Sequence, residues 1–395
     1  MKKILKLTAI LALASTLSAC GGKGNSNNSS IDESPSIVSE SEEEIVYKFE
    51  EEQIYSKIWE SKVIYNEPCV MIEDDDGVKS ASLLYTPTRI ISVRNYTLQK
   101  EYDKSEYRVE GNKIYMTEKS TMPYLTQKNI SCEEIPPVIG GSYDDGKGGN
   151  ILFTEGFGIV YHQIEVTYEH NDTWDGAIPQ KQGRNLVNTY NKLKNKEDIN
   201  IVVNGDSIFT GANASSALAI EPFLDKFPDA FASEITRRYG SPTHLTNTSK
   251  GGEKSDFGKA NVETAVNYYN PDLVVIGYGM NDGSWNIPAS DYVDNIEFMI
   301  KSIQNNCPNA DIIVCATILA NPASSQNKGQ ADYLLPLKSM VEQYSNTALL
   351  DMTTFSKDLL RHKTSFELYA NNINHPCDYM VRNYAVNLLN LLEVK

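Results

Sequence analysis

The sequence predicts an α/β domain with a parallel sheet, preceded by a β-sandwich domain. Between residues 45 and 175, short apolar or alternating runs are separated by turn residues, a pattern typical of antiparallel strands. After residue 198, continuous apolar runs alternate with segments of helical spacing, as in parallel strands connected by helices. A chain of 395 residues is also long enough for two folded units of roughly 100 to 200 residues each.

The strands expected in the first region are short. Residues 160–168 alternate, with Ile164, Val166 and Tyr168 on one face and polar side chains on the other. Together with similar runs they predict a small β-sandwich. The further strands are expected at residues 62–65, 82–85, 89–93 and 113–116.

The strands expected in the second region are continuous apolar runs, as buried parallel strands are. Between two of them Val293, Ile296 and Ile300 repeat at helical spacing, and a closing helix is expected where Tyr384 and Leu388 do the same. This alternation of strand and helix predicts a doubly wound domain. The expected strands lie at residues 199–204, 273–277, 312–316 and 347–352.

The N-terminal twenty residues carry a targeting pattern. Three lysines are followed by the apolar run 7–13 and then by Leu17-Ser18-Ala19-Cys20. This resembles a bacterial lipoprotein signal peptide, which implies cleavage before Cys20 and diacylglyceryl modification of its thiol. The expected location is a membrane surface outside the cytoplasm, with the lipid on Cys20 as the anchor. The alternative is an ordinary secretory signal with an incidental cysteine.

The composition narrows the range of partners and cofactors. The formal net charge is -16, with 36 basic and 52 acidic residues, and such a field repels nucleic acid. Beyond Cys20 five cysteines remain, without regular spacing, a CxxC pair or a histidine-rich tract. We therefore expect no disulfide framework, no metal and no other cofactor.

Four polar segments follow predicted elements of the second region, where functional groups of parallel sheets gather. The first strand ends in Gly205-Asp206-Ser207, on what should be an exposed turn. A serine hydroxyl needs an adjacent base and oxyanion donors to act as a nucleophile. By itself, however, this tripeptide is also an ordinary turn and helix cap.

The other three segments supply the groups that such a serine requires. The Gly251-Gly252 pair allows backbone N–H groups to approach a substrate oxygen, and Asn281 offers a side-chain N–H. His375, one of five histidines, lies on a loop just before the closing helix. Each segment alone also fits a loop, an Asx turn or a structural histidine.

In this order, the four segments resemble the SGNH (GDSL-type) hydrolase family, over roughly the C-terminal half of the chain. The resemblance implies a flavodoxin-like domain in which Ser207 is the nucleophile and His375 is the general base. It implies that Gly252, with Gly251 as the alternate, and Asn281 complete the oxyanion hole with the Ser207 N–H. The chain then divides into a signal peptide (1–19), a flexible linker (20–44), a β-sandwich (45–175), a connector (176–197) and the hydrolase domain (198–395).

One position departs from the family's pattern. The family usually has an aspartate three residues before the histidine, and this chain has Asn372 there. An asparagine offers no charge to the imidazolium, but its side-chain oxygen, or a backbone carbonyl, could still hold the histidine Nδ1–H. We expect an active Ser–His pair with a neutral orienting group; the alternative is a weakened or inactive enzyme.

The β region preceding this domain is similar to the jelly-roll module of bacterial carbohydrate esterases. The expected function is therefore the removal of O-acetyl groups from polysaccharide or oligosaccharide. Trp285, close behind Asn281, is a candidate sugar-stacking platform, and Trp174 is a weaker one. Two other function classes stay open: a lipolytic esterase, thioesterase or acyltransferase, and a non-catalytic carbohydrate-binding lipoprotein.

Overall fold

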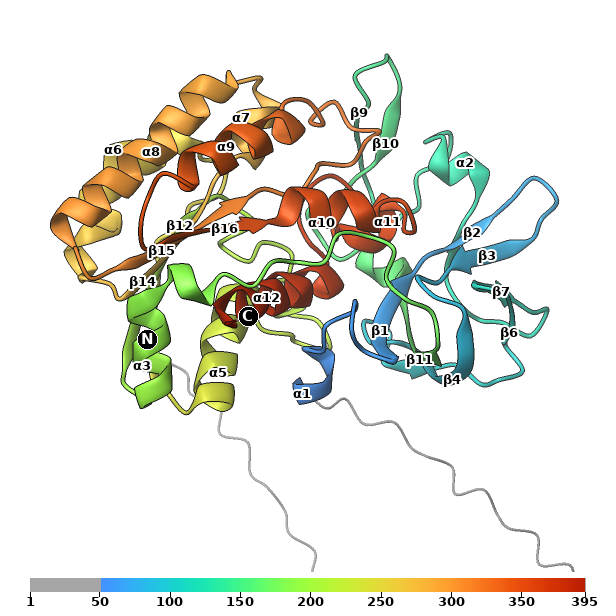
Figure 1. Cartoon of the computed structure of the whole chain (residues 1–395). Coiled ribbons are helices and arrows are strands. Elements are labelled where there is room, and N and C mark those ends of the chain that lie inside the picture. Colours follow the sequence, from blue (N-terminus) through green and yellow to red (C-terminus); the bar gives the residue numbers. More distant parts are fainter. Residues whose placement is uncertain (1–50, 395) are drawn as a thin grey trace, which may run out of the picture. The chain divides into compact units, whose positions relative to one another are not determined.

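A five-stranded parallel sheet organises the second half of the chain (Figure 1). The strand order is β13-β12-β14-β15-β16, and every neighbouring pair is parallel. This is the 2-1-3-4-5 order of flavodoxin-like domains, and it confirms the predicted α/β class. The strands are β12 (Ile199–Gly205), β13 (Thr243–Asn247), β14 (Leu273–Gly277), β15 (Asp311–Ala316) and β16 (Thr347–Asp351).

Helices cover both faces of this sheet, α6, α8 and α9 on one side and α3, α5 and α12 on the other (Figure 1). Short elements occupy the loops between them. The helices are α3 (Val187–Asn195), α4 (Ser215–Leu218), α5 (Phe227–Tyr239), α6 (Ser255–Ala265), α7 (Met280–Ser284), α8 (Ala289–Asn306), α9 (Leu334–Val341), α10 (Met352–Leu359), α11 (Ser365–Leu368) and α12 (Asp378–Leu392). The 3₁₀ turns of this region are η2 (Gly183–Asn185), η3 (Asn267–Tyr269) and η4 (Gln330–Tyr333).

The strand side chains alternate between two apolar layers. Val274 and Ile276 pack among α6, α8 and α9, while Val203 and Val275 pack on the opposite face. Because both faces are covered, the inner strands β14 and β15 are almost continuously apolar, as the sequence predicted. The amphipathic pattern around Val293 corresponds to α8, which buries one face against α6 and α9.

Two glycines allow the ends of β12 and β14 to lie close together. Gly205 pairs with Gly277, and a Cβ on Gly205 would lie 2.3 Å from the Gly277 carbonyl oxygen. A Cβ on Gly277 would lie 1.9 Å from the ring of Phe209. Only glycine therefore leaves space for this ring, which covers the strand ends where the chain turns at Asp206 and Ser207.

Two mainly antiparallel sheets form the region before the α/β domain, as predicted. Both contribute to one apolar core, with Val93 and Val166 from the first sheet and Ala81 and Ile114 from the second. The first sheet has the order β1-β11-β4-β5 and contains β1 (Val63–Cys69), β4 (Pro87–Asn95), β5 (Lys100–Glu101) and β11 (Ile164–His170). The second has the order β6-β7-β3-β2-β8 and contains β2 (Met71–Glu73), β3 (Lys79–Ser82), β6 (Tyr107–Glu110), β7 (Lys113–Met116) and β8 (Tyr124–Leu125). A separate hairpin joins β9 (Ser142–Asp144) and β10 (Asn150–Leu152), and the short helices are α1 (Glu51–Ile54), α2 (Gln127–Ile130) and the 3₁₀ turn η1 (Val160–His162).

Two expected strands differ from the structure. The strand expected at 160–168 begins only at Ile164, because residues 160–162 form a 3₁₀ turn closed by local backbone hydrogen bonds. The strand expected at 82–85 ends at Ser82. Beyond it the Leu84 N–H donates to the Glu67 carboxylate and the Tyr85 N–H to the Tyr168 hydroxyl, so side chains replace a strand partner.

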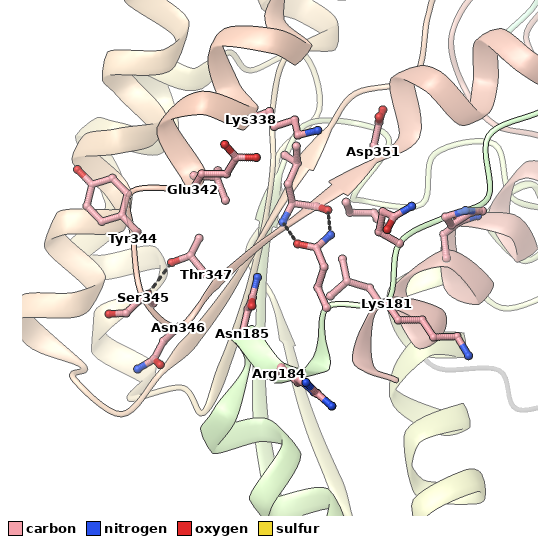
Figure 2. Close-up of a pocket in the computed structure, with 18 of the residues that line it drawn as sticks. Lys181, Arg184, Asn185, Lys338, Glu342, Tyr344, Ser345, Asn346, Thr347 and Asp351 are labelled. Carbon is pink, nitrogen blue, oxygen red and sulfur yellow. Dashed lines mark hydrogen bonds between the residues drawn. The ribbon is translucent and has the colours of Figure 1, made fainter. Parts of the chain in front are cut away.

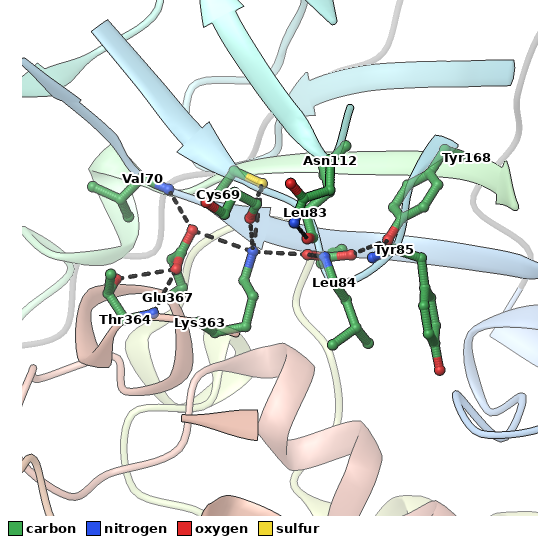
Figure 3. A network of polar contacts seen from close by, with 12 residues as sticks. Cys69, Val70, Leu83, Leu84, Tyr85, Asn112, Tyr168, Lys363, Thr364 and Glu367 are labelled. Atoms are coloured by element: carbon green, nitrogen blue, oxygen red, sulfur yellow. Dashed lines mark hydrogen bonds and ion pairs between the residues drawn. The ribbon is translucent and has the colours of Figure 1, made fainter. Parts of the chain in front are cut away.

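A buried ion network joins the β region to the α/β domain (Figure 3). The Lys363 ammonium donates to the carboxylate of Glu67 on β1 at 2.7 Å and lies 3.2 Å from that of Glu367 on α11. It also donates to the Ser82 carbonyl at 2.6 Å. The Lys363 and Glu67 side chains are fully buried, so each charge depends on the other for its stability.

The computed structural model describes residues 51–394, with side chains from Gln53 onward. The expected signal peptide, Cys20 and the linker up to residue 44 lie outside these described residues and stay predictions. The boundaries proposed within the remaining chain also stay predictions. Within residues 51–394, no helix combines the length and apolarity needed to cross a membrane.

Candidate active site

The candidate site lies where β12 and β14 end, the point at which the strand order reverses and ligands bind in such sheets. The buried carboxylate of Asp206 accepts the Ile208 N–H at 3.0 Å and also the Met280 N–H. It thereby ties the turn after β12 to the start of α7. Burial outweighs these donors and raises the pKa of Asp206 to about 7.

Ser207 and His375 face each other at this point. The distance between Ser207 Oγ and His375 Nε2 is 3.0 Å, within reach for proton transfer. The sequence placed Ser207 on an exposed turn, and this is corrected: the residue is only 9% exposed. The Ser207 carbonyl accepts from the Thr210 hydroxyl and the Ala212 N–H, and these bonds draw the chain after Ser207 into a tight loop.

The opposite nitrogen of the His375 ring meets two acceptors. Asn213 Oδ1 lies 2.5 Å from Nδ1, and the Glu155 carboxylate lies 3.2 Å from it. Asn213 Nδ2 donates to the Glu155 backbone carbonyl at 2.9 Å, so the amide oxygen is the atom that faces the ring. An Nδ1–H bound in this way leaves Nε2 as the acceptor for the serine proton.

Asn372 does not orient His375, contrary to the expectation from its position in the sequence. Its Nδ2 donates to the Leu152 carbonyl at 2.8 Å, and its Oδ1 accepts from the Ser365 hydroxyl at 2.8 Å. Its side chain is buried, and its φ of 63° lies in the left-handed region. A backbone carbonyl, the other expected orienting group, is not the partner either, because Nδ1 contacts side-chain oxygens.

The neighbouring Asn371 shapes the loop that carries the histidine. Its Oδ1 accepts the backbone N–H groups of Ile373, Asn374 and His375 at 2.9 to 3.0 Å. This Asx-type turn fixes the backbone from which the His375 ring projects. The cluster of asparagines at 371–374 was a signal for such a turn, but nothing in the sequence linked Asn213 or Glu155 to the histidine.

Ser207 and the adjacent Gly251-Gly252 turn carry backbone N–H groups that have no acceptor in the described part of the chain. Within residues 51–394, the N–H groups of Ser207, Gly251 and Gly252 donate to no protein acceptor. A Cβ on Gly251 would lie 3.7 Å from the Ser207 Cβ, so the Gly251-Gly252 turn directly borders the nucleophile. Gly252 has a φ of 79°, which glycine adopts without strain. Backbone N–H groups without a protein acceptor are the kind of donor that can bind a developing oxyanion.

Asn281 and the two tryptophans have different surroundings. Asn281, on α7, donates one Nδ2 hydrogen to the Glu253 carbonyl at 2.8 Å, which leaves the second hydrogen available. Trp285, which ends the same helix, is 73% exposed. Trp174 instead packs against the core, and its Nε1 donates to the Ala177 carbonyl. Trp285 therefore stays a candidate for ligand contact, and Trp174 is a packing residue.

A cavity of about 760 Å³ lies elsewhere, along the edge strand β16 (Figure 2). The Gln182 side chain pairs with both backbone groups of Leu349 there, like a short strand partner. The residues that line this cavity include Lys181, Lys338 and Tyr344 but neither Ser207 nor His375. No group of three or more metal-ligating side chains occurs within the described part of the chain.

Comparison with known proteins gives a family match in the second half of the chain. Residues 203–376 match the GDSL-like Lipase/Acylhydrolase family, a range that contains all four polar segments. No curated protein gave a significant match.

Two solved structures show weak similarity. A two-domain esterase (CEX) active on acetylated mannans, crystallised with mannopentaose, has 17% identity and a TM-score of 0.44 over 55% of this chain and 55% of that chain. The acetylxylan esterase Axe2 from Geobacillus stearothermophilus has 18% identity and a TM-score of 0.41 over 50% of this chain and 95% of that one. The chain thus matches little more than half the length of the first structure.

Proposed function

We propose that the protein is a serine esterase that removes acetyl groups from polysaccharide or oligosaccharide. The observation that carries this proposal is the 3.0 Å contact between Ser207 Oγ and His375 Nε2, beside backbone N–H groups without an acceptor in the described chain. A base within hydrogen-bonding distance and a set of oxyanion donors are the two requirements of a serine nucleophile.

The geometry suggests a two-step acyl transfer. His375 Nε2 takes the Ser207 proton as Oγ attacks the acyl carbonyl, and the N–H groups of Ser207, Gly252 (or Gly251) and Asn281 bind the oxyanion. As the bond to the sugar breaks, the protonated imidazole gives its proton to the departing sugar oxygen, which leaves as a hydroxyl. Water, deprotonated by His375, hydrolyses the acyl-serine and regenerates the enzyme.

Two features favour a small acyl group on a sugar. Ser207 is 9% exposed and the side chain of His375 is 14% exposed, so little of this pair is open to solvent. Trp285 presents a free aromatic face on the helix that also carries Asn281, and aromatic faces stack on sugar rings. We propose that the acetyl group enters beside Ser207 while the sugar contacts Trp285.

The test measures the hydrolysis of nitrophenyl acetate and of nitrophenyl decanoate. It compares the wild type with Ser207→Ala and with the surface control Ser290→Ala. We expect a strong preference for acetate, loss of hydrolysis in Ser207→Ala and wild-type rates in Ser290→Ala. Acetate release from acetylated oligosaccharides identifies the sugar. A preference for decanoate would instead support a lipolytic esterase, and inertness with retained sugar binding would support a binding protein.

A further inference from the structure

Residues from two regions that are distant in the sequence contact Nδ1 of His375. Asn213 follows β12 in the α/β domain, whereas Glu155 follows β10 in the β region. Both oxygens lie within 3.2 Å of the same ring nitrogen. The position that usually carries an acid, Asn372, is occupied with other partners. Any negative charge at the imidazole must therefore come from elsewhere.

The two acceptors have different tasks because they differ in distance and charge. Asn213 Oδ1, at 2.5 Å, is the closer acceptor, and its amide is fixed by the bond from Nδ2 to the Glu155 carbonyl. Asn213 is thus sufficient to set the tautomer and the ring plane. It is neutral, however, and cannot offset the positive charge that the ring gains when it takes the serine proton.

Glu155 has the charge that Asn213 lacks. Its hydrogen bond to His375 lowers the pKa of its carboxyl, even though partial burial acts in the opposite direction, so Glu155 is ionised at neutral pH. Asn371 Nδ2 lies 3.5 Å from its second oxygen and restricts the side chain further. The other direct polar partners of the His375 ring, Ser207 and Asn213, are uncharged.

We propose that Glu155, a residue of the β region, is the charged positioning partner of His375, in place of the acid that position 372 lacks. The inference rests on the proposed esterase function of Ser207 and His375. In this interpretation, the β region contributes a residue to the active site of the α/β domain. The hairpin before Glu155 is held in place by contacts with the loop after β15: Ser325 donates to the Asp144 carbonyl and Gln326 to the Tyr143 hydroxyl.

The solvent exposure of Glu155 limits how much its charge can contribute to turnover. The Glu155 side chain is 59% exposed, and ion pairs in contact with water contribute little because solvent screens them. Removing an aspartate from a buried triad costs about 10⁴ in turnover, largely through the wrong tautomer. Here Asn213 still holds the tautomer, so we expect only a roughly fivefold loss when the charge is removed.

The test compares the full-length wild type with Glu155→Gln, Glu155→Asp and the exposed control Glu133→Gln. For Glu155→Gln we expect kcat on a short acetyl ester to fall roughly fivefold with an unchanged KM, because the charge acts on the imidazolium and not on substrate binding. Glu155→Asp should recover most of the rate, and Glu133→Gln should match the wild type.

A second readout does not depend on activity. The ¹H NMR signal of the His375 Nδ1–H, assigned with His375→Ala, should move upfield in Glu155→Gln relative to the wild type, because the carboxylate that lies 3.2 Å from Nδ1 deshields this proton. Equal signals and equal rates would overturn the inference. If no variant shows Ser207-dependent hydrolysis, the proposed function fails, while the Nδ1–H signal still decides whether Glu155 acts on His375.

Discussion

The carboxamide of Asn372 shows how single polar atoms determine the architecture of this site. Both ends of the amide are used: Nδ2 donates to the Leu152 carbonyl and Oδ1 accepts from Ser365. An aspartate has no hydrogen to donate, so it would place an anionic oxygen against the Leu152 carbonyl in a buried position. The residue is therefore adapted to hold the β10 segment against the histidine loop.

Asn372→Asp should consequently destabilise the protein without raising its activity. We expect the free energy of unfolding to fall by about 1–3 kcal/mol, the cost of an unsatisfied buried group. Urea denaturation compared with the exposed control Asn185→Asp measures this difference. A stable Asn372→Asp variant with a hundredfold gain in kcat/KM would instead identify position 372 as a degenerate triad acid.

Asn281 tests the oxyanion hole. Asn281→Ala removes the free Nδ2 hydrogen and should lower kcat/KM about 10²–10³-fold, the usual cost of losing one oxyanion donor. The exposed Asn327→Ala variant serves as the control for asparagine removal near the same loops. An unchanged rate in Asn281→Ala would exclude its side chain from the site.

At the scale of elements, the sequence was most informative where one periodic pattern filled a whole element. The strand at 273–277 was predicted with its full extent, and α8 was found from Val293, Ile296 and Ile300. Both are local patterns of side chains facing a covered layer. The strand expected at 82–85 ends early because the N–H groups of Leu84 and Tyr85 donate to the side chains of Glu67 and Tyr168, which no local pattern reveals.

The candidate site shows the same difference between local patterns and tertiary contacts. Ser207, Gly251, Asn281 and His375 follow secondary-structure elements of the α/β domain, so strand ends indicated them. Glu155 and Asn213 could not be found in this way, because their contact with the ring depends on how the β10 segment packs against the histidine loop. Polar partners that are distant in sequence are fixed by tertiary packing alone.

The buried ion pairs of Lys363 also connect elements that are distant in the sequence, and they predict a loss of stability when the lysine is replaced (Figure 3). Lys363→Met leaves the buried carboxylates of Glu67 and Glu367 without their cation, and breaking such a pair costs about 3–5 kcal/mol. The exposed Lys357→Met on α10 is the matched control. Equal denaturation midpoints for the two variants would show that the network contributes no net stability.

For the whole molecule, the N-terminal pattern predicts attachment to a membrane through Cys20, which lies outside the described residues. A diacyl group anchors a protein stably, whereas a single chain binds only marginally. In a bacterial host, Cys20→Ser should therefore move the protein from the membrane fraction to the soluble fraction. Unchanged membrane partition of Cys20→Ser would exclude the lipoprotein interpretation, and the catalytic assignments do not depend on the outcome.

The central claim is that Ser207 is a nucleophile activated by His375, and a short-chain fluorophosphonate tests it most directly, because the reagent reacts covalently with activated serines. Peptide mass spectrometry of the labelled full-length protein locates the adduct. We predict one adduct on Ser207 in the wild type, greatly slowed labelling in His375→Ala and none in Ser207→Ala. Wild-type protein that stays unlabelled, or is labelled at another serine, would contradict the account.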